Sequence, residues 1–351
     1  MFEKRLLKIN RDDNYNIDKS EFLRLDANER VIPFSKKDLN FLKKIVNNNI
    51  LQSYPTYRKP LVDIISKKEK IKNSQISITP GADTVLKYIF EIISKLKGNV
   101  LSINPTYGMI SVYCKIYNKK HYKINENELE KFNHFSNYKN LSLIYIANPN
   151  SPSGKIIPKE TISSIIKFSK KKNILFIIDE AYVDYSKSKS LTSLIKKNNN
   201  ILILKTYSKY FGLAGVRIGY VIANKNLIKA INSVRPPHDI SSLGVDILKY
   251  FLLKKNDNYL KQIAKSKNYI KKYCKKNNIK IYMTEANFFH IFEEKNKILN
   301  IVNKLKKNKI LVKSNYLNLS NVSYSGPKNT IRVSIGSIKQ MKFFFKKFKE
   351  I

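Results

Sequence analysis

The sequence is poor in cysteine and in metal-binding patterns. Its two cysteines, Cys114 and Cys274, lie far apart and belong to no Cys-x-x-Cys pair, so they neither staple a small secreted domain nor begin a zinc site. The four histidines form no H-E-x-x-H or H-x-x-x-H pair, which excludes the common zinc-hydrolase patterns. We therefore expect no bound metal and a location in the reducing cytoplasm.

Long apolar runs are also missing. The N-terminal stretch MFEKRLLKINRDDNYN returns to charged residues before an apolar leader region could form, and no segment reaches the length of a membrane span. Glycine and proline are sparse, at 10 and 11 residues, whereas 42% of the residues are hydrophobic. This composition is typical of a globular protein, and we expect a soluble chain of roughly two domains with a full core.

Acidic residues are scarce, with 26 Asp+Glu against 67 Lys+Arg and a formal net charge of +41. A basic balance this large makes a nucleic-acid-binding protein one hypothesis. The lysines, however, are spread over the whole length beside Asn and Ile, as in KKNNNI at 196–201, and these residue types share A/T-rich codons. No zinc-finger spacing or RNP-type aromatic strand is present. We favour a solvated Lys-rich surface with no specific nucleic-acid site; its charge would still attract anionic substrates.

The middle of the chain alternates short apolar runs with helical patterns. The apolar runs lie at 99–104, 141–148, 173–180, 200–206 and 217–224, and the helical patterns at 83–96, 107–117, 159–171 and 191–197. Continuous β-branched runs between helices indicate buried strands of a mostly parallel α/β sheet. Ligands of such sheets bind beyond the carboxyl ends of the strands. Past about residue 245, amphipathic helices and the strand-like segments ANFFHIFEE and TIRVSIG predict a smaller α+β unit.

Two residues near strand ends are candidates for chemistry. Asp179 closes the run ILFIID, and a carboxylate at the end of a buried strand is costly without a partner; taken alone, it could equally be a helix cap or a surface strand end. Lys209 follows the run ILILKT among the hydroxyls of Thr206, Tyr207 and Ser208. The Gly-rich turn GLAG and Arg217 come next, and hydroxyls, a basic side chain and exposed amides together suit a phosphate.

Other candidates are weaker when taken singly. Ala82 and Asp83 open a helix after a small-residue turn, which presents N–H groups to an anion or is an ordinary cap. Tyr107 in NPTYG follows a predicted strand, where its ring could stack on a planar cofactor or merely pack. The turn NPNSPSG follows another strand at 148–154. Arg332 in TIRVSIG could pair with a carboxylate or form a surface ion pair.

Taken together, these motifs resemble the fold-type I aminotransferase superfamily, and most closely its histidinol-phosphate aminotransferase branch. The motifs GAD, NPTYG, NPNxPxG, DEAY, TxSKxFGLAGxRxGY and RVSIG occur in family order, and LDANE at 25–29 and SYPTYR at 53–58 extend the match over roughly residues 20–340. The resemblance implies an aspartate aminotransferase-like α/β fold. It would have a large three-layer cofactor domain at 41–245 and a smaller α+β domain formed by 1–40 and 246–351.

The resemblance also implies pyridoxal 5'-phosphate as cofactor, and roles for its catalytic residues. Lys209 would carry the cofactor covalently and shuttle a proton, Asp179 would pair with the pyridine nitrogen, and Tyr182 would hydrogen-bond the ring O3'.

Further roles follow by the same motif match. The remaining cofactor-binding residues would be Tyr107 on the ring, Ala82, Asp83, Thr206, Ser208 and Arg217 on the phosphate, Ser151 near O3', and Tyr54 on the phosphate of a partner subunit, in a homodimer with shared sites. Arg332 would clamp the substrate carboxylate or its phosphate-bearing end, with Asn28 and His238 as further substrate contacts.

The sequence departs from the family at two places. Ser151 stands where the usual NPNNPTG motif has its second Asn of the NN pair, and Ser153 replaces its Thr. In RPPHDISSLG at 235–244, His238 and Asp239 stand where an aromatic residue and Asn are usual. His238 is therefore a substrate contact or simply a loop residue.

Two enzyme activities fit this set of residues. The first is transamination between a small, phosphorylated amine or amino acid, with histidinol phosphate as default, and 2-oxoglutarate/glutamate. The second is decarboxylation of a phosphorylated amino acid of the threonine-phosphate type, since that family shares the same Lys, Asp and Arg. They differ in which bond at Cα breaks, which the sequence does not reveal.

Overall fold

The computed structural model describes residues 3–9, 18–55, 58–129, 137–254, 258–315 and 328–351. A large sheet of seven strands has the order β2-β8-β7-β6-β5-β3-β4. These strands are β2 (Ile76–Thr79), β3 (Asn99–Ile103), β4 (His121–Ile124), β5 (Leu141–Ala147), β6 (Leu175–Asp179), β7 (Ile201–Thr206) and β8 (Gly219–Ile222). Each apolar run in the middle of the chain therefore forms a strand, as predicted.

The large sheet is mostly parallel, which confirms the predicted fold class. Only β8 runs antiparallel to its neighbours, β2 and β7. Its direction follows from the segment 207–218, which turns back at the end of β7 without a crossover helix. This reversal places the Lys209 turn directly at the carboxyl end of a buried strand.

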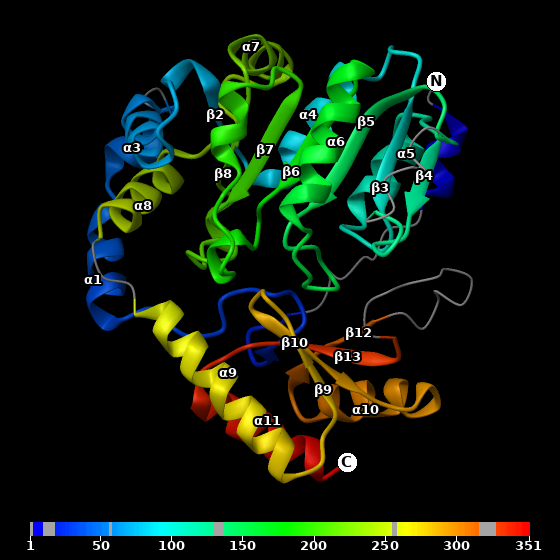
Figure 1. The fold of residues 1–351 in the computed structure, drawn as a ribbon. Coiled ribbons are helices and arrows are strands. Elements are labelled where there is room, and N and C mark those ends of the chain that lie inside the picture. Colours follow the sequence, from blue (N-terminus) through cyan, green and yellow to red (C-terminus); the bar gives the residue numbers. More distant parts are fainter. Residues whose placement is uncertain (1–2, 10–17, 56–57, 130–136, 255–257, 316–327) are drawn as a thin grey trace.

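Helices cover both faces of this sheet (Figure 1). One face packs on α4 (Ala82–Ile92), α5 (Met109–Ile116) and α7 (Lys225–Val234). The other packs on α3 (Lys59–Glu69), α6 (Lys159–Lys171) and α8 (Ser242–Leu253). In α6 the buried residues Ile162, Ile165 and Ile166 recur at helical spacing, so a single apolar stripe faces the strands. The helical pattern at 191–197 is a short 3₁₀ helix, η5 (Thr192–Lys196), rather than an α-helix.

A smaller sheet of four strands, in the order β12-β13-β10-β9, lies below the large sheet in Figure 1. Its strands are β9 (Ile281–Met283), β10 (Phe288–Phe292), β12 (Lys313–Asn315) and β13 (Thr330–Ser334), and its helices are α9 (Tyr259–Lys276), α10 (Lys295–Lys307) and α11 (Ile338–Lys349). The core of this unit contains Phe289, Ile298 and Phe344, and it also takes in Leu25 and Ile32 from the N-terminal part of the chain.

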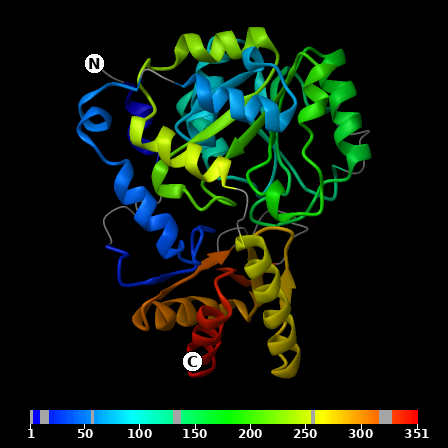
Figure 2. The same cartoon turned by 90° about the vertical axis from the view of Figure 1, so that its left-hand side faces the viewer.

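The N-terminal part crosses between the two units (Figure 2). Strand β1 (Leu23–Arg24) pairs in parallel with β11 (Ile310–Leu311), after which α1 (Lys36–Ile45) and α2 (Asn48–Gln52) pack on α8. The remaining short helices are η1 (Lys4–Lys8), η2 (Asn73–Gln75), η4 (Val183–Tyr185) and η6 (Ala214–Val216). Within the described ranges, no helix combines the length and the apolar character that crossing a membrane requires.

Candidate active site

The segments that follow β5, β6 and β7 meet the smaller unit and the N-terminal segment. The carbonyl oxygen of Pro152 lies 2.9 Å from Nε2 of His290 on β10. After β6 and β7, Tyr182 and Lys209 contact Asn28 and Ala27. Because the carboxyl ends of parallel strands share one edge of a sheet, these contacts gather the predicted side chains at the edge where ligands of α/β sheets bind.

Asp179 is buried at the end of β6, and its side chain is held by two hydrogen bonds. The Tyr145 hydroxyl donates to Oδ2 at 2.7 Å, and the Ala181 amide donates to Oδ1 at 2.9 Å. The parallel register that pairs Ala147 with Asp179 puts Tyr145 on the same face of the sheet. Burial raises the pKa of Asp179, while these two hydrogen bonds and the attraction of Lys209 oppose the rise. A cationic group bound beside Asp179 would therefore be strongly favoured.

Lys209 lies within electrostatic reach of Asp179. Its Nζ donates to the carbonyl oxygen of Ala27 at 2.9 Å and lies 5.8 Å from the centre of the Tyr182 ring. The turn that presents Lys209 depends on Gly212, which has a φ of +73° and packs so closely on Arg30 that a Cβ would lie 2.2 Å from its Cδ. A side chain at position 212 is therefore excluded by both backbone conformation and space.

Tyr182 occupies the space between these groups and the smaller unit. Its hydroxyl oxygen accepts a hydrogen bond from Asn28 Nδ2 at 3.0 Å. Burial acts to raise the pKa of Tyr182, but Lys209, Arg332 and hydrogen bonds from Asn28 and Ser151 together lower it. Ser151, the residue that departs from the family motif, thus lies beside the Tyr182 oxygen.

An anion-binding cradle lies at the N-terminus of α4. Gly81, with a φ of +84°, precedes the helix, and a Cβ at this position would lie 3.0 Å from Nη2 of Arg217. Arg217 also approaches the Ser208 hydroxyl, at 3.5 Å between Nη1 and Oγ. Thr206 accepts a hydrogen bond from the Ser208 amide at 3.1 Å. Free helix amides, hydroxyls and a guanidinium group in one place favour a phosphate group.

Tyr107 and Asp83 border this cradle. Asp83 accepts a hydrogen bond from the Tyr113 hydroxyl at 3.2 Å. The Tyr107 residue is 40% exposed, while its hydroxyl is directed toward Asp83; burial of the hydroxyl and the nearby carboxylate raise the pKa of Tyr107. The exposed ring is free to cover a flat ligand, and its hydroxyl stays protonated.

Arg332 is the basic residue that the smaller unit contributes to this site. It lies on β13 opposite His290 of β10, and its Nη2 donates to the carbonyl oxygen of Asp26 at 2.7 Å. Its Nε is buried and has no hydrogen-bond partner among the residues that the structure describes. An unsatisfied buried guanidinium nitrogen is costly, so a bound carboxylate or phosphate would complete the hydrogen bonding of Arg332.

Two of the residues predicted for the site, Tyr54 and His238, contact each other at a different place on this chain. Tyr54 is 72% exposed, and its ring stacks on that of His238 at 4.5 Å between centroids. The described contacts of His238 thus join it to Tyr54 rather than to Lys209, Asp179 or Arg332.

Three groups of this site could not be recognised from the sequence. Tyr145 is a single hydroxyl in an apolar strand, and only the β5–β6 register reveals its contact with Asp179. Ala27 contributes a backbone carbonyl, a group that every residue has and that the sequence therefore cannot single out. His290 is completely buried between the Pro152 carbonyl and the Thr330 hydroxyl, and burial lowers its pKa to about 3.

The family model for aminotransferase class I and II matches residues 23–348. The histidinol-phosphate aminotransferase of Buchnera aphidicola subsp. Schizaphis graminum is 32% identical over 339 residues, which cover 89% of this chain and 87% of that protein. The enzyme of the same name from Caldanaerobacter subterraneus subsp. tengcongensis is 29% identical over 350 residues, covering 96% and 95%.

Solved structures share the fold. The histidinol-phosphate aminotransferase from Sinorhizobium meliloti, solved in complex with pyridoxal-5'-phosphate, superimposes with a TM-score of 0.79 at 20% identity. The match covers 93% of this chain and 91% of that one.

Proposed function

The chain belongs to the class I and II aminotransferase family, and we propose that it transfers an amino group between histidinol phosphate and 2-oxoglutarate, with glutamate as the second product. It is an aminotransferase, and its cofactor is pyridoxal phosphate. The observation that carries the proposal is the convergence of one lysine amine, one buried carboxylate and one anion cradle at the same sheet edge. A lysine amine, a buried carboxylate and an anion cradle are the groups that would hold an aldehyde, a ring nitrogen and a phosphate of one planar molecule.

In this proposal Lys209 and Asp179 are the two main catalytic residues. When bound, the cofactor draws electrons from the Cα of the substrate, which weakens the bonds at that carbon. Lys209 Nζ would hold the cofactor through its aldehyde and, once the substrate amine had displaced it, would be free to carry the proton that leaves Cα of the substrate. Asp179 holds a proton on the ring nitrogen, and the Tyr145 hydroxyl and the Ala181 amide fix the orientation of its carboxylate. Asn28 orients the Tyr182 hydroxyl toward the ring oxygen.

The other residues fix the cofactor in place. The phosphate would lie against the backbone of Ala82 and Asp83 and the side chains of Thr206, Ser208 and Arg217. Tyr107 would cover the ring, and Ser151 would assist Tyr182 at the ring oxygen. The lowered pKa of Tyr182 suits a hydroxyl that shares a proton with this oxygen.

Arg332 would serve both substrates. Histidinol phosphate and glutamate both carry an anionic group. Nε of Arg332, which has no partner in the described part of the chain, and the second N–H of Nη2, whose first donates to Asp26, would offer a fork of donors to either. The Asn28 main chain and side chain are fixed by Ser334 and Tyr182, and in this proposal Asn28 would lie between the substrate and the cofactor oxygen.

The proposed assembly is a homodimer. An exposed apolar face on α1, α2 and α8 carries Phe41, Ile50 and Leu253 around a hollow of about 590 Å³. An apolar face of this kind marks a protein-contact surface, and a second copy of the chain is the proposed occupant. Tyr54, which is highly exposed beside this face, would then reach the phosphate of the partner's cofactor.

Domain boundaries and cellular location complete the proposal. We propose residues 41–245 as the cofactor-binding domain, and 1–40 with 246–351 as the domain that carries Arg332. Helix α8 spans this boundary and packs on the large sheet. The cytoplasm, where the two buried cysteines would stay reduced, is the proposed location.

A product assay tests the proposed activity. The purified protein, loaded with pyridoxal phosphate, is incubated with histidinol phosphate and 2-oxoglutarate, and glutamate is measured. We expect one glutamate for each histidinol phosphate consumed. Release of carbon dioxide from threonine phosphate without any need for 2-oxoglutarate would instead assign the decarboxylase activity.

Replacing Arg332 by lysine tests the anion clamp. Arg332→Lys keeps the charge but loses the fork of donors, so we expect KM for histidinol phosphate to rise about ten- to a hundredfold, the effect of one hydrogen bond between charged groups. The value of kcat should change much less. Arg24→Lys, at an exposed ion pair with Glu29, is the control and should leave both constants unchanged. An unaltered KM in Arg332→Lys would remove Arg332 from the substrate site.

A further inference from the structure

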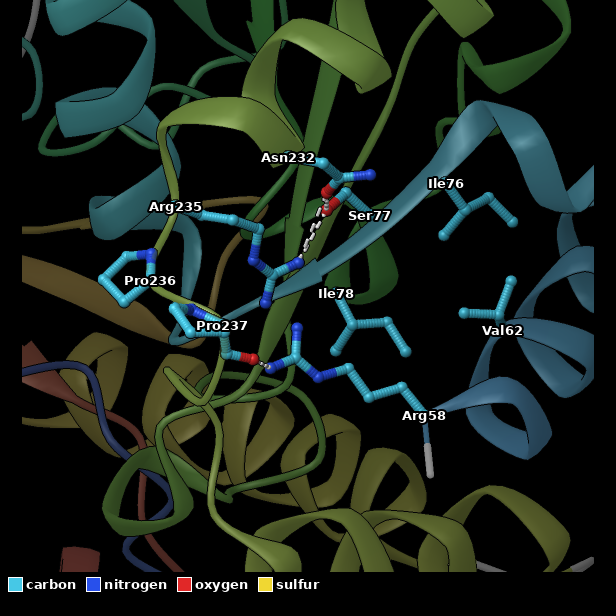
Figure 3. A pocket seen from close by; sticks show the side chains of 9 residues that line it. All are labelled: Arg58, Val62, Ile76, Ser77, Ile78, Asn232, Arg235, Pro236 and Pro237. Atoms are coloured by element: carbon cyan, nitrogen blue, oxygen red, sulfur yellow. Dashed lines mark hydrogen bonds between the residues drawn. The ribbon is translucent and has the colours of Figure 1, made fainter. Parts of the chain in front are cut away.

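The loop between α7 and α8 holds a buried ion cluster that the proposed reaction does not use. Asp239, whose side chain is 5% exposed, accepts hydrogen bonds from Arg235 Nε at 3.1 Å and from the Tyr88 hydroxyl at 3.0 Å. It also pairs with Arg58, at 3.2 Å between Oδ1 and Nη2. Figure 3 shows the two guanidinium groups approaching each other, with Arg58 directed at the Pro237 carbonyl oxygen. One carboxylate therefore pairs with two arginines from different elements.

This cluster anchors the segment that carries Tyr54. The Arg58 side chain donates to the Pro237 carbonyl oxygen, and four residues earlier the Tyr54 ring stacks on His238 with 23° between the ring planes. The Ser242 hydroxyl donates to the Ser53 carbonyl oxygen at 3.4 Å. The segment before α3 is thus fastened to the α7–α8 loop on both sides of Tyr54.

The anchor depends on charge more than on packing. A cavity of about 380 Å³ lies beside Arg58 and is lined by Val62, Ile76 and Ile78 (Figure 3). Space is therefore available for the Arg58 side chain to move if its partner is lost. Burial and the neighbouring Arg235 lower the pKa of Arg58, and Asp239 counteracts both. Burial and the same carboxylate raise the pKa of Tyr88 to about 12, so Tyr88 remains a donor.

We propose that Asp239 is a positioning residue that holds Tyr54 outward for the cofactor phosphate of a second copy of the chain. The proposal rests on the proposed homodimer with shared sites. An uncharged amide at position 239 would leave two buried guanidinium groups without a counter-ion, which is unfavourable. Arg58 would then leave the Pro237 carbonyl, and the Tyr54–His238 stack would lose its support on one side.

The test is a double-mutant cycle on cofactor binding. The apparent Kd for pyridoxal phosphate is measured by equilibrium dialysis for the unaltered protein, Asp239→Asn, Tyr54→Phe and the double variant. We expect each single variant to raise Kd about tenfold, the loss of one hydrogen bond to a charged group. The double variant should bind no more weakly than Tyr54→Phe alone, since Asp239 acts through Tyr54.

Asp63→Asn is the matched control, because Asp63 also pairs with a cation, Lys59, but at a more exposed site on α3; its Kd should stay unchanged. Arg58→Lys is a second variant in case Asp239→Asn does not fold, and its Kd should also rise. An unchanged Kd in Asp239→Asn, or an equal effect of Asp239→Asn with and without the Tyr54 hydroxyl, would overturn the proposal. An unchanged Kd in Tyr54→Phe, with glutamate still formed, would overturn both the positioning role of Asp239 and the shared site. It would leave the transaminase activity standing.

Discussion

Lys209→Ala is expected to reduce kcat for glutamate formation by about 10⁴-fold or more, the upper range for a positioned proton-transfer group. The variant loses both the amine that attaches the cofactor and the base that moves the proton at Cα. Among the described residues, it loses a single hydrogen bond, from Nζ to the Ala27 carbonyl oxygen. Thermal unfolding of the cofactor-free protein should therefore change little, while steady-state assays show almost no turnover.

The high lysine content of the chain makes a matched control essential. Lys225→Ala removes an exposed lysine at the start of α7, on the surface of the large unit. It should retain full activity and unfold at the same temperature. A Lys209→Ala variant that turns over at a rate close to that of Lys225→Ala would refute the assignment of the catalytic amine.

Asp179→Asn is expected to lower kcat by about a thousandfold, because a buried charge pair of several kcal/mol is lost and each 1.36 kcal/mol corresponds to a factor of ten. The amide keeps the shape of the carboxylate but cannot hold a proton on the ring nitrogen. Cofactor affinity should fall as well, since the negative charge that attracts the ring is gone. Both constants can be measured with the same preparation, by product assay and by dialysis.

The variants Tyr145→Phe and Tyr182→Phe show how large the loss of activity in Asp179→Asn is by comparison. Tyr145→Phe removes the hydrogen bond at 2.7 Å to Oδ2 but leaves the carboxylate, and should cost about tenfold, as expected for one hydrogen bond to a charged group. Tyr182→Phe should likewise cost far less than loss of Asp179. If Asp179→Asn were no more impaired than Tyr145→Phe, the charge of Asp179 would have no special part in the reaction.

Much of this arrangement could be predicted because it follows from strand ends. Asp179 closes one apolar run and Lys209 follows the next, and neighbouring parallel strands bring their carboxyl ends to one edge. The sequence order of strands and helices in the large sheet was predictable for the same reason, since continuous apolar runs with helices between them favour a buried parallel sheet.

What could not be predicted depends on register and on contacts between distant segments. Tyr145 faces Asp179 only because of how β5 pairs with β6, and a one-residue slip would turn its hydroxyl to the other face. The antiparallel direction of β8 depends on how the 207–218 segment turns back. The Tyr54–His238 stack joins residues far apart in sequence, and no local pattern carries that information.

The most direct test of the central claim is to locate the cofactor on the chain. The protein loaded with pyridoxal phosphate is reduced with borohydride, which fixes the bond between a lysine amine and the aldehyde, and the modified peptide is identified by mass spectrometry. In a chain with 67 Lys+Arg residues, we expect one stoichiometric label, on Lys209, and its loss in Lys209→Ala. A label spread over many lysines, or placed at another single lysine, would contradict the account.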